Sequence, residues 1–303
     1  MREDQTALIT GGTDGIGKEI AHRLASEGVR VFIVGSNEEK GQRAEAELRK
    51  ASKSDSVHFI RADLSLMQDT YRLAEEITAH IPKLHYLVLC AGIVRGERTV
   101  TPEGIETNFA VDYLTRFALA TRLLAPMQAA GAPDMAARMV IIGGAAQNGT
   151  IHYDDVNLTN RFNVLRVVSQ FCEANDVFVI ELARRLAQSA EKRFITVNTL
   201  KVGVVRTNIR QQFPLWMKII VPLIADPLLG QTPQRIADSA MCLLTAPEYE
   251  GQTGGLYSHI TRFKPVTPGQ KTSSTEEGKR LWDLSERLVA KASAHTAPHL
   301  SLA

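Results

Sequence analysis

The sequence predicts an α/β fold in which helices flank a doubly wound parallel sheet. Short apolar runs alternate with amphipathic segments up to about residue 205, the order expected when strands alternate with crossover helices. A glycine-rich turn with Gly11, Gly15 and Gly17 lies between the first apolar run and the first amphipathic segment. Because the alternation is unbroken, we expect a single domain spanning residues 1–303 rather than two small domains.

Six buried strands are expected, because six short apolar runs have the near-continuous hydrophobic character of parallel strands. They cover residues 7–10, 29–34, 57–60, 84–89, 139–142 and 196–200. Between the first two runs, apolar residues from Ile16 to Ala25 recur at helical spacing, and Gly28 is expected to end that helix. These first three elements predict a β-α-β unit.

Four more crossover helices are expected from their periodicity, over residues 38–50, 68–80, about 102–130 and about 162–190. Beyond the sixth strand, a helix is expected to begin at Thr232-Pro233, because proline is favoured in the first helical turn. A last helix is expected at Ser274, because Ser274 and Glu277 have the spacing of a capping box. Residues 231–303 are therefore predicted to be a C-terminal helical extension.

Residues 209–230 contain an apolar run that is interrupted by Pro214, Pro222 and Pro227. The prolines make this run too broken to span a bilayer. A lid that packs on its own domain is favoured over contact with a membrane surface, because the polar face of a surface-binding helix is missing. An apolar lid predicts an apolar small-molecule substrate.

Composition argues against several classes of protein. The formal charge is +2, with 35 basic and 33 acidic residues well mixed, so nucleic acid is not expected as a partner. The three cysteines, Cys90, Cys172 and Cys242, are widely spaced, which favours reduced thiols over a disulfide framework or a metal site. The charged N-terminus leads directly into the first apolar run, leaving no room for a signal peptide. A cytoplasmic protein with no transmembrane segment is expected.

The glycine-rich turn predicts a dinucleotide site, because missing side chains let a pyrophosphate approach the helix N-terminus. Its wider pattern, Thr10-Gly-x-x-x-Gly-Ile-Gly17, resembles the short-chain dehydrogenase/reductase family. The resemblance continues through Ala62-Asp63-Leu64, Cys90-Ala91-Gly92 and Val202-Gly203-Val204-Val205-Arg206-Thr207. The C-terminal segment is similar to the retinol-dehydrogenase-like branch, which handles apolar carbonyl compounds. The resemblance implies a Rossmann-type domain, NAD(P) as cofactor, and pairing into homodimers or homotetramers.

The cofactor-binding residues follow from this resemblance and from the turn. They are Gly11, Thr13, Asp14, Gly15, Ile16, Gly17, Ser36, Asn37, Asp63, Leu64, Cys90, Ala91, Gly92, Gly203, Val205 and Thr207. A carboxylate at the end of the second strand would favour NAD, but Gly35-Ser36-Asn37 offers none. We therefore expect NADP, with Lys40 as a further phosphate contact. The alternative is that residues 35–37 form an ordinary turn and that NAD also binds.

The catalytic residues of the family are missing. In this family a tyrosine donates a proton to the substrate oxygen, a lysine lowers the pKa of that tyrosine, and a serine binds the same oxygen. The chain contains no Tyr-x-x-x-Lys, no serine between Ser65 and Ser169, and no lysine between Lys83 and Lys192. By resemblance, the serine, tyrosine and lysine positions are occupied by Gly144, Val168 and Cys172.

Few residues could replace them. Tyr153 is the only tyrosine between residues 114 and 248, so it is a candidate proton donor, and Asn108 matches an asparagine that the family carries in its fourth helix. The alternative is that Tyr153 only packs in the loop after the fifth strand. Cys172 could be reactive near a nicotinamide, but a small buried apolar role is favoured.

Three functions stay open. The first is an NADP(H)-dependent reductase of specialised metabolism that transfers hydride to an iminium or a conjugated system, where no tyrosine is needed. The second is a non-redox cyclase or isomerase that holds its substrate in a reactive geometry. The third is a nucleotide-binding pseudoenzyme. The fold cannot choose among them.

Overall fold

A computed structural model of the protein describes residues 2–192, 194–203, 205 and 230–295. Its centre is one eight-stranded sheet in the order β3-β2-β1-β4-β5-β6-β7-β8. The strands are β1 Thr6–Thr10, β2 Arg30–Gly35, β3 Val57–Arg61, β4 Tyr86–Leu89, β5 Ala137–Gly144, β6 Ile195–Val202, β7 Leu256–His259 and β8 Phe263–Val266. All neighbouring strands run parallel except β7 and β8. The predicted doubly wound α/β fold is confirmed.

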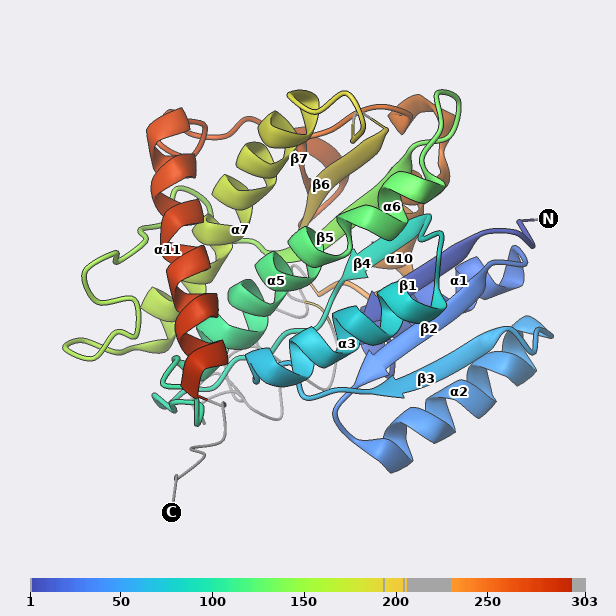
Figure 1. Cartoon of the computed structure of the whole chain (residues 1–303), viewed down its shortest axis with the longest axis horizontal. Coiled ribbons are helices and arrows are strands. Elements are labelled where there is room, and N and C mark those ends of the chain that lie inside the picture. The colour runs from blue at the N-terminus through green and yellow to red at the C-terminus, as the bar shows by residue number, and fades with distance from the viewer. Residues whose placement is uncertain (1, 193, 204, 206–229, 296–303) are drawn as a thin grey trace, which may run out of the picture.

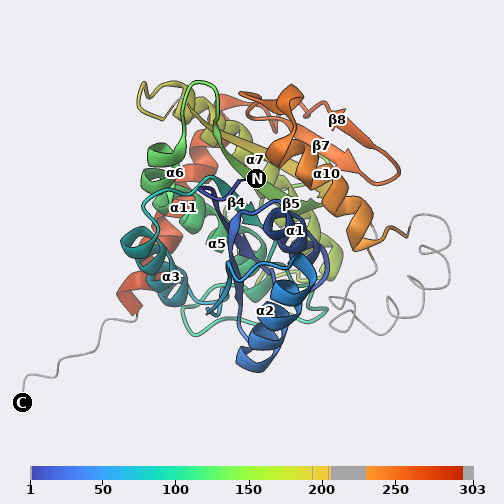
Figure 2. The ribbon, with the colours of Figure 1, turned by 90° about the vertical axis from the view of Figure 1, so that its right-hand side faces the viewer.

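Helices cover both faces of this sheet (Figures 1 and 2). The helical elements are α1 Gly15–Ser26, α2 Glu38–Ser52, α3 Met67–His80, α4 Thr107–Phe109, the π-turn η1 Ala110–Leu114, α5 Thr115–Arg122, α6 Leu124–Ala130, α7 Val164–Ala187, α10 Pro233–Thr245, the 3₁₀ turn η4 Pro247–Tyr249 and α11 Thr275–His295. Helices α1, α2 and α10 pack on one face, whereas α3, α5, α7 and α11 pack on the other. No helix in these ranges is long and apolar enough to cross a membrane.

The first six strands match the predicted apolar runs, but β7 and β8 were not predicted. Both are only four residues long, with the sequences LYSH and FKPV. Neither has the uninterrupted apolar run that marks a buried strand, and β8 is largely exposed at the sheet edge. The C-terminal extension that was predicted as helical over 231–303 therefore also contains two strands, which complete the sheet.

The predicted helix over 102–130 begins later and is broken. Glu106 determines its start, because its carboxylate oxygens accept hydrogen bonds from the backbone amides of Asn108 (3.1 Å) and Phe109 (2.8 Å). Before it, a turn closes from the Thr101 amide to the Ile105 carbonyl, with Gly104 at φ +80°. Four elements, α4, η1, α5 and α6, then replace one continuous helix. A π-turn of this kind places extra backbone in a helix, often beside a functional site.

The other helix boundaries follow their predicted signals. Gly28 adopts φ +93° and ends α1 in the left-handed conformation that glycine favours. Thr232 caps α10, accepting from the Arg235 amide at 3.4 Å. The Ser274 hydroxyl accepts from the Glu277 amide at 3.4 Å at the start of α11, as half of the predicted capping box requires.

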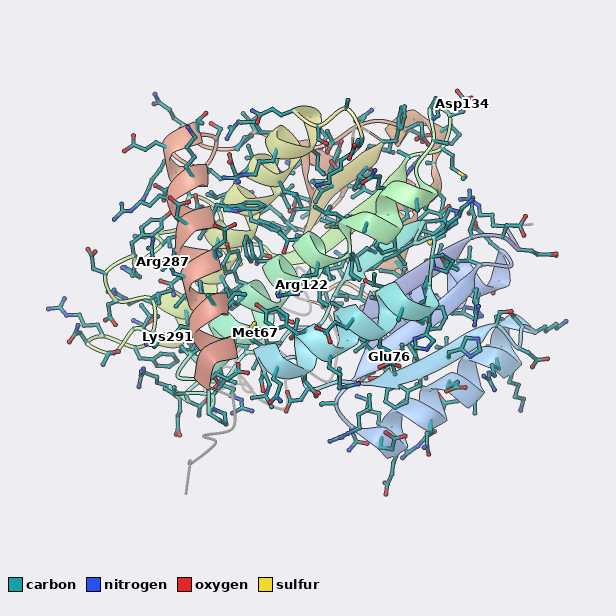
Figure 3. All side chains as sticks on the ribbon, in the orientation of Figure 1. Met67, Glu76, Arg122, Asp134, Arg287 and Lys291 are labelled. Atoms are coloured by element: carbon teal, nitrogen blue, oxygen red, sulfur yellow. The ribbon has the colours of Figure 1, made fainter. Side chains whose placement is uncertain are left out.

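The C-terminal helix α11 belongs to the core. Trp282 packs edge-on against Phe117 of α5 with ring centroids 5.0 Å apart, and Ser285 bonds to the Tyr113 hydroxyl at 2.6 Å. On the outer side of the same helical layer, the exposed Arg122 of α5 stacks on Tyr71 of α3 at 3.7 Å (Figure 3). The predicted lid, by contrast, falls on residues 209–230, of which only Gly230 lies within the described ranges.

Candidate functional site

The glycine-rich turn joins β1 to α1 at the carboxyl edge of the sheet. Asp14 caps α1, because its Oδ1 accepts from the Gly15 amide at 2.8 Å. Gly11 has φ +67°, and a Cβ there would lie 2.9 Å from the Ala91 backbone. A Cβ at Gly17 would lie 2.5 Å from the Gly11 carbonyl oxygen. Both glycines are thus required for the tight turn that leaves the α1 amides accessible to an anion.

The end of β4 is tied to this turn. The Thr10 hydroxyl oxygen accepts from the amides of Cys90 (3.0 Å) and Ala91 (3.1 Å). Burial raises the pKa of the Cys90 thiol to about 11, so the thiol is uncharged at neutral pH. The structure therefore brings together two of the predicted cofactor segments, residues 11–17 and 90–92, through backbone contacts that do not depend on the side chain at position 90.

The third predicted segment lies at the ends of β2 and β3. Asn37 caps α2, with Oδ1 accepting from the Lys40 amide at 2.8 Å, and the Lys40 ammonium pairs with Asp14 Oδ2 at 2.6 Å. A hollow of about 590 Å³ opens here, lined by Ser36, Asn37, Glu38, Glu39 and Arg61. Arg61 is the cation among the residues that line the hollow, and Lys40, next to Glu39 in the chain, is paired with Asp14.

Arg61 is a candidate for the nucleotide site that was not predicted from the sequence. Its Nε donates to the Ser36 carbonyl at 3.3 Å, which holds the guanidinium over the end of β2. A signal for it existed, since Arg61 is the last residue of the third strand and directly precedes Ala62-Asp63. Asp63 itself stabilises its own turn, accepting from the Ser65 amide (3.0 Å) and hydroxyl (2.8 Å), and Leu64 is buried beside it.

Gly144 and Cys172 face each other where β5 ends against α7. A Cβ added at Gly144 would lie 2.7 Å from Cys172 Sγ, so the thiol fills the space that any larger residue at 144 would need. Burial raises the pKa of the Cys172 thiol to about 11. Val168, one helical turn earlier, packs against the same apolar cluster. The three positions matched to the catalytic residues of the family therefore carry no hydroxyl or ammonium group in the structure.

Two buried ion pairs flank Cys172, and neither was predicted. Asp112 and Arg116 lie beneath Gly92 on the η1–α5 segment, 3.6 Å apart and almost fully buried. The Arg116 guanidinium also donates to the Ala91 carbonyl (2.8 Å) and to Asn175 Oδ1 (3.4 Å), while its buried Nε has no partner among the described residues. Burial raises the pKa of Asp112 to about 7, against the opposing effect of Arg116.

The second pair joins α7 to β6. The Lys201 ammonium bonds to Asp176, and both side chains are buried. Burial raises the pKa of Asp176 to about 6. Sequence reasoning passed over both pairs because no local pattern marks a charged residue as buried. The spacing of Asp112 and Arg116 fits an ordinary exposed helical pair equally well.

Asn108 and Tyr153 are engaged in structural contacts. Asn108 is fully buried; its Oδ1 accepts from the Arg95 amide (2.7 Å) and its Nδ2 donates to Glu106 (2.8 Å). The Tyr153 hydroxyl donates to Glu277 of α11 (2.9 Å), and Arg280 stacks over its ring at 3.9 Å. Burial and the Glu277 carboxylate raise the pKa of Tyr153 far above its usual range. These contacts favour the loop-packing alternative for Tyr153.

The remaining predicted cofactor residues lie beyond β6. Gly203 packs beside Ile260, whose Cγ2 would be 3.3 Å from a Cβ at this position, and Val205 pairs with Gln231 in an isolated bridge. Thr207 lies outside the described residues.

Comparisons with known proteins agree with this geometry. Residues 5–153 match the short chain dehydrogenase family. Human polyprenol dehydrogenase is 30% identical over 288 residues, covering 94% of this chain and 84% of the relative. Mouse retinol dehydrogenase 12 is 31% identical over 286 residues, covering 94% and 86%.

Solved structures show the same fold. The complex of Pseudomonas aeruginosa RhlG with NADP superposes with a TM-score of 0.66 at 25% identity, covering 85% of this chain and 95% of that one. The 3-ketoacyl-(acyl-carrier-protein) reductase of Brucella melitensis with NADH gives a TM-score of 0.63 at 22% identity, covering 84% and 96%.

Proposed function

The chain belongs to the short-chain dehydrogenase/reductase family, and we propose that it is an NADP(H)-dependent reductase of an apolar small molecule that works without a tyrosine proton donor. The observation that carries the proposal is the contact between Gly144 and Cys172. These residues stand at the positions matched to the family serine and lysine, and the thiol occupies the volume of the missing serine. The nucleotide side keeps its close glycine contacts. The site thus departs from the family pattern at the catalytic positions, whereas the glycine turn of the nucleotide site follows it.

The missing groups favour a substrate that needs no proton on an oxygen. Bound NADPH supplies a hydride, and an iminium carbon that accepts it leaves a neutral amine rather than an oxyanion. A lysine ammonium at position 172 would repel a cationic iminium, whereas the uncharged Cys172 thiol does not. The flanking cations Arg116 and Lys201 are each paired with a carboxylate. A conjugated C=C/C=O system is the other substrate class, with the final proton taken from water.

The preference for NADP rests on the corner between β2 and β3. No carboxylate occupies residues 35–37, and Arg61 and Lys40 both lie near the end of β2. A guanidinium binds a 2′-phosphate through two parallel hydrogen bonds, which a ribose hydroxyl cannot match in charge. Glu38 and Glu39 line the same hollow and oppose the effect, so NAD is expected to bind more weakly rather than not at all.

The test has two stages. Titration with NADPH, followed by the quenching of tryptophan fluorescence, should show saturable binding; its absence would remove the proposal. NADPH oxidation is then measured with panels of iminium, enone and quinone compounds, and Tyr153→Phe should turn over like the wild type because its hydroxyl is bound to Glu277. Binding without oxidation of any compound would instead favour a non-redox cyclase or isomerase, or a nucleotide-binding pseudoenzyme.

A further inference from the structure

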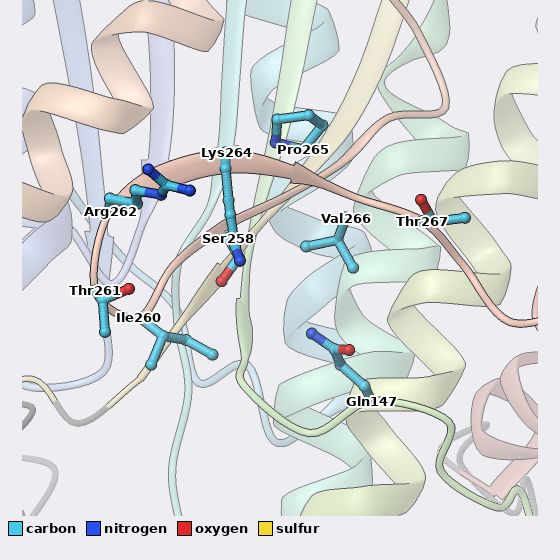
Figure 4. A pocket seen from close by; sticks show the side chains of 9 residues that line it. All are labelled: Gln147, Ser258, Ile260, Thr261, Arg262, Lys264, Pro265, Val266 and Thr267. Carbon is cyan, nitrogen blue, oxygen red and sulfur yellow. The ribbon is translucent and has the colours of Figure 1, made fainter.

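A second hollow, of about 410 Å³, lies between the β7–β8 hairpin and the loop that follows β5 (Figure 4). Arg262 and Lys264 come from the hairpin, Ser258 from β7, and Gln147 from the loop. None of the residues that line the hollow is acidic. This composition differs from that of the chain as a whole, where basic and acidic residues nearly balance.

Ser258 is the most deeply buried polar residue among those that line the hollow, at 2% exposed. Its hydroxyl is not among the fully buried side-chain atoms that lack a partner in the described ranges. The antiparallel register sets Ser258 directly opposite Lys264, so both side chains lie on the same face of the sheet. Figure 4 shows the Lys264 side chain directed toward Ser258, with Gln147 across the hollow. A serine hydroxyl that lines a hollow can donate a hydrogen bond to a group that enters it.

The charged groups of Arg262 and Lys264 are also available to bind a ligand. Neither Arg262 nor Lys264 forms an ion pair with a carboxylate in the described ranges, and both side chains are exposed. A guanidinium, an ammonium and a hydroxyl that line one hollow are donors of the kind that bind an oxyanion. Pro265 and Val266 add an apolar wall to the same hollow.

The hollow adjoins Gly203, one of the cofactor-binding residues that the family resemblance implies. Ile260 lines it and also packs on Gly203, where a Cβ would lie 3.3 Å from the Ile260 Cγ2. A ligand held by Lys264 and Arg262 could therefore extend past Ile260 toward Gly203.

We propose that this hollow binds the carboxylate or phosphate group of a small-molecule ligand, through Lys264, Arg262 and the Ser258 hydroxyl. The significance of its position beside Gly203 rests on the proposed function, because the ligand would be an amphipathic substrate with an acidic end. The anion site itself depends only on its own residues, so it can be tested apart from the reaction.

The experiment uses the full ¹⁵N-labelled chain, with amide shifts followed by NMR. Sodium acetate and sodium phosphate are titrated separately at ionic strength held constant with sodium chloride, with and without saturating NADPH. The amides of residues 258–264 should shift and saturate in both cofactor conditions. Lys264→Gln and Arg262→Gln should each raise the dissociation constant at least fivefold. The exposed control Lys279→Gln on α11 removes the same charge and should change it less than twofold.

The two anions distinguish a carboxylate site from a phosphate site. Shifts that do not saturate, or that weaken equally in Lys279→Gln, would mean nonspecific attraction and would overturn the proposal. Loss of the hairpin shifts upon NADPH addition would place the anion in the nucleotide site and would also overturn it. If NADPH fails to bind the wild type, the proposed reductase fails, while the titration without cofactor still decides the anion site. Ser258→Ala, which leaves both charges in place, should weaken binding by a smaller factor.

Discussion

Asp112 shows how a single buried carboxyl group links this site to stability. Its folded pKa of about 7 lies above the ordinary value of 3.8, because burial disfavours the charged form more than Arg116 restores it. The folded state thus holds a proton that the unfolded chain has already released. By linkage, the free energy of unfolding falls as the pH rises from about 4 to about 7, by up to about 1.4 kcal/mol per pH unit. Above pH 7 this contribution is constant.

We expect Asp112→Asn to remove this dependence. Asp176, with a pKa of about 6, is present in both proteins, so urea denaturation between pH 6 and 7 should show a smaller loss of stability in the variant than in the wild type. The control is Asp134→Asn, an exposed change in the loop before β5 (Figure 3), which should keep the wild-type slope. Equal slopes for Asp112→Asn and the wild type would show that Asp112 titrates normally. The absolute stability of the variant is not the readout, since Arg116 loses its partner.

Arg61 carries the prediction on cofactor choice. If its guanidinium binds the 2′-phosphate, Arg61→Gln should raise the dissociation constant of NADPH about tenfold, which corresponds to about 1.4 kcal/mol. The affinity for NADH should change less than twofold, because NADH has no phosphate at that position. Lys50→Gln, an exposed change at the other end of α2, is the matched control and should affect neither nucleotide. Fluorescence titrations with both nucleotides measure the ratio, and a parallel loss of both affinities would argue against this role.

At the scale of elements, α11 is predicted to be part of the folding unit. Leu281 is 1% exposed within the apolar layer that includes α5 and α7. Leu281→Ala should therefore lower the free energy of unfolding by about 2–5 kcal/mol, the usual cost of a large-to-small change in a core. The control Arg287→Ala, an exposed residue on the same helix (Figure 3), should cost less than about 0.5 kcal/mol. Similar small effects for both would indicate that α11 docks only loosely.

Elements with strong local signals were predictable from the sequence, and those that depend on tertiary contacts were not. The strands β1 to β6 and the helix starts at Thr232 and Ser274 depend on neighbouring residues in the chain, so the sequence pattern was sufficient to predict them. The strand β8 pairs through its backbone with β7, and its four-residue sequence, FKPV, contains a lysine and a proline that are as typical of a loop as of an edge strand. The start of α4 depends on the Glu106 side chain, which accepts hydrogen bonds from two amides that no periodicity reveals.

The residues of the candidate site also fall into those with a local signal in the sequence and those that depend on tertiary contacts. The glycine turn was predictable because backbone conformation at Gly11 restricts the residue type, whereas Asp112, Arg116, Asp176 and Lys201 were missed because burial is a property of the assembled layers. Their charges lie between elements that are distant in sequence. Tyr153 was singled out by elimination, and its hydroxyl instead meets a helix more than a hundred residues later.

At the scale of the whole molecule, the two helical layers share one sheet, so the chain should unfold in a single transition that the nucleotide shifts. Ligand at 100 times its dissociation constant stabilises the folded state by about 2.7 kcal/mol, which should raise the Tm of a chain of this length by roughly 4 °C in calorimetry. Gly17→Ala should abolish this shift, because the added Cβ would lie 2.5 Å from the Gly11 carbonyl and distort the turn that presents the α1 amides. Gly251→Ala is the matched control, since no atom lies within 4 Å of its added Cβ; its φ of +70° makes it lower the Tm somewhat without changing the NADPH-induced rise. Two separate transitions, or an equal NADPH shift in Gly17→Ala, would contradict the coupling between this turn and the rest of the fold.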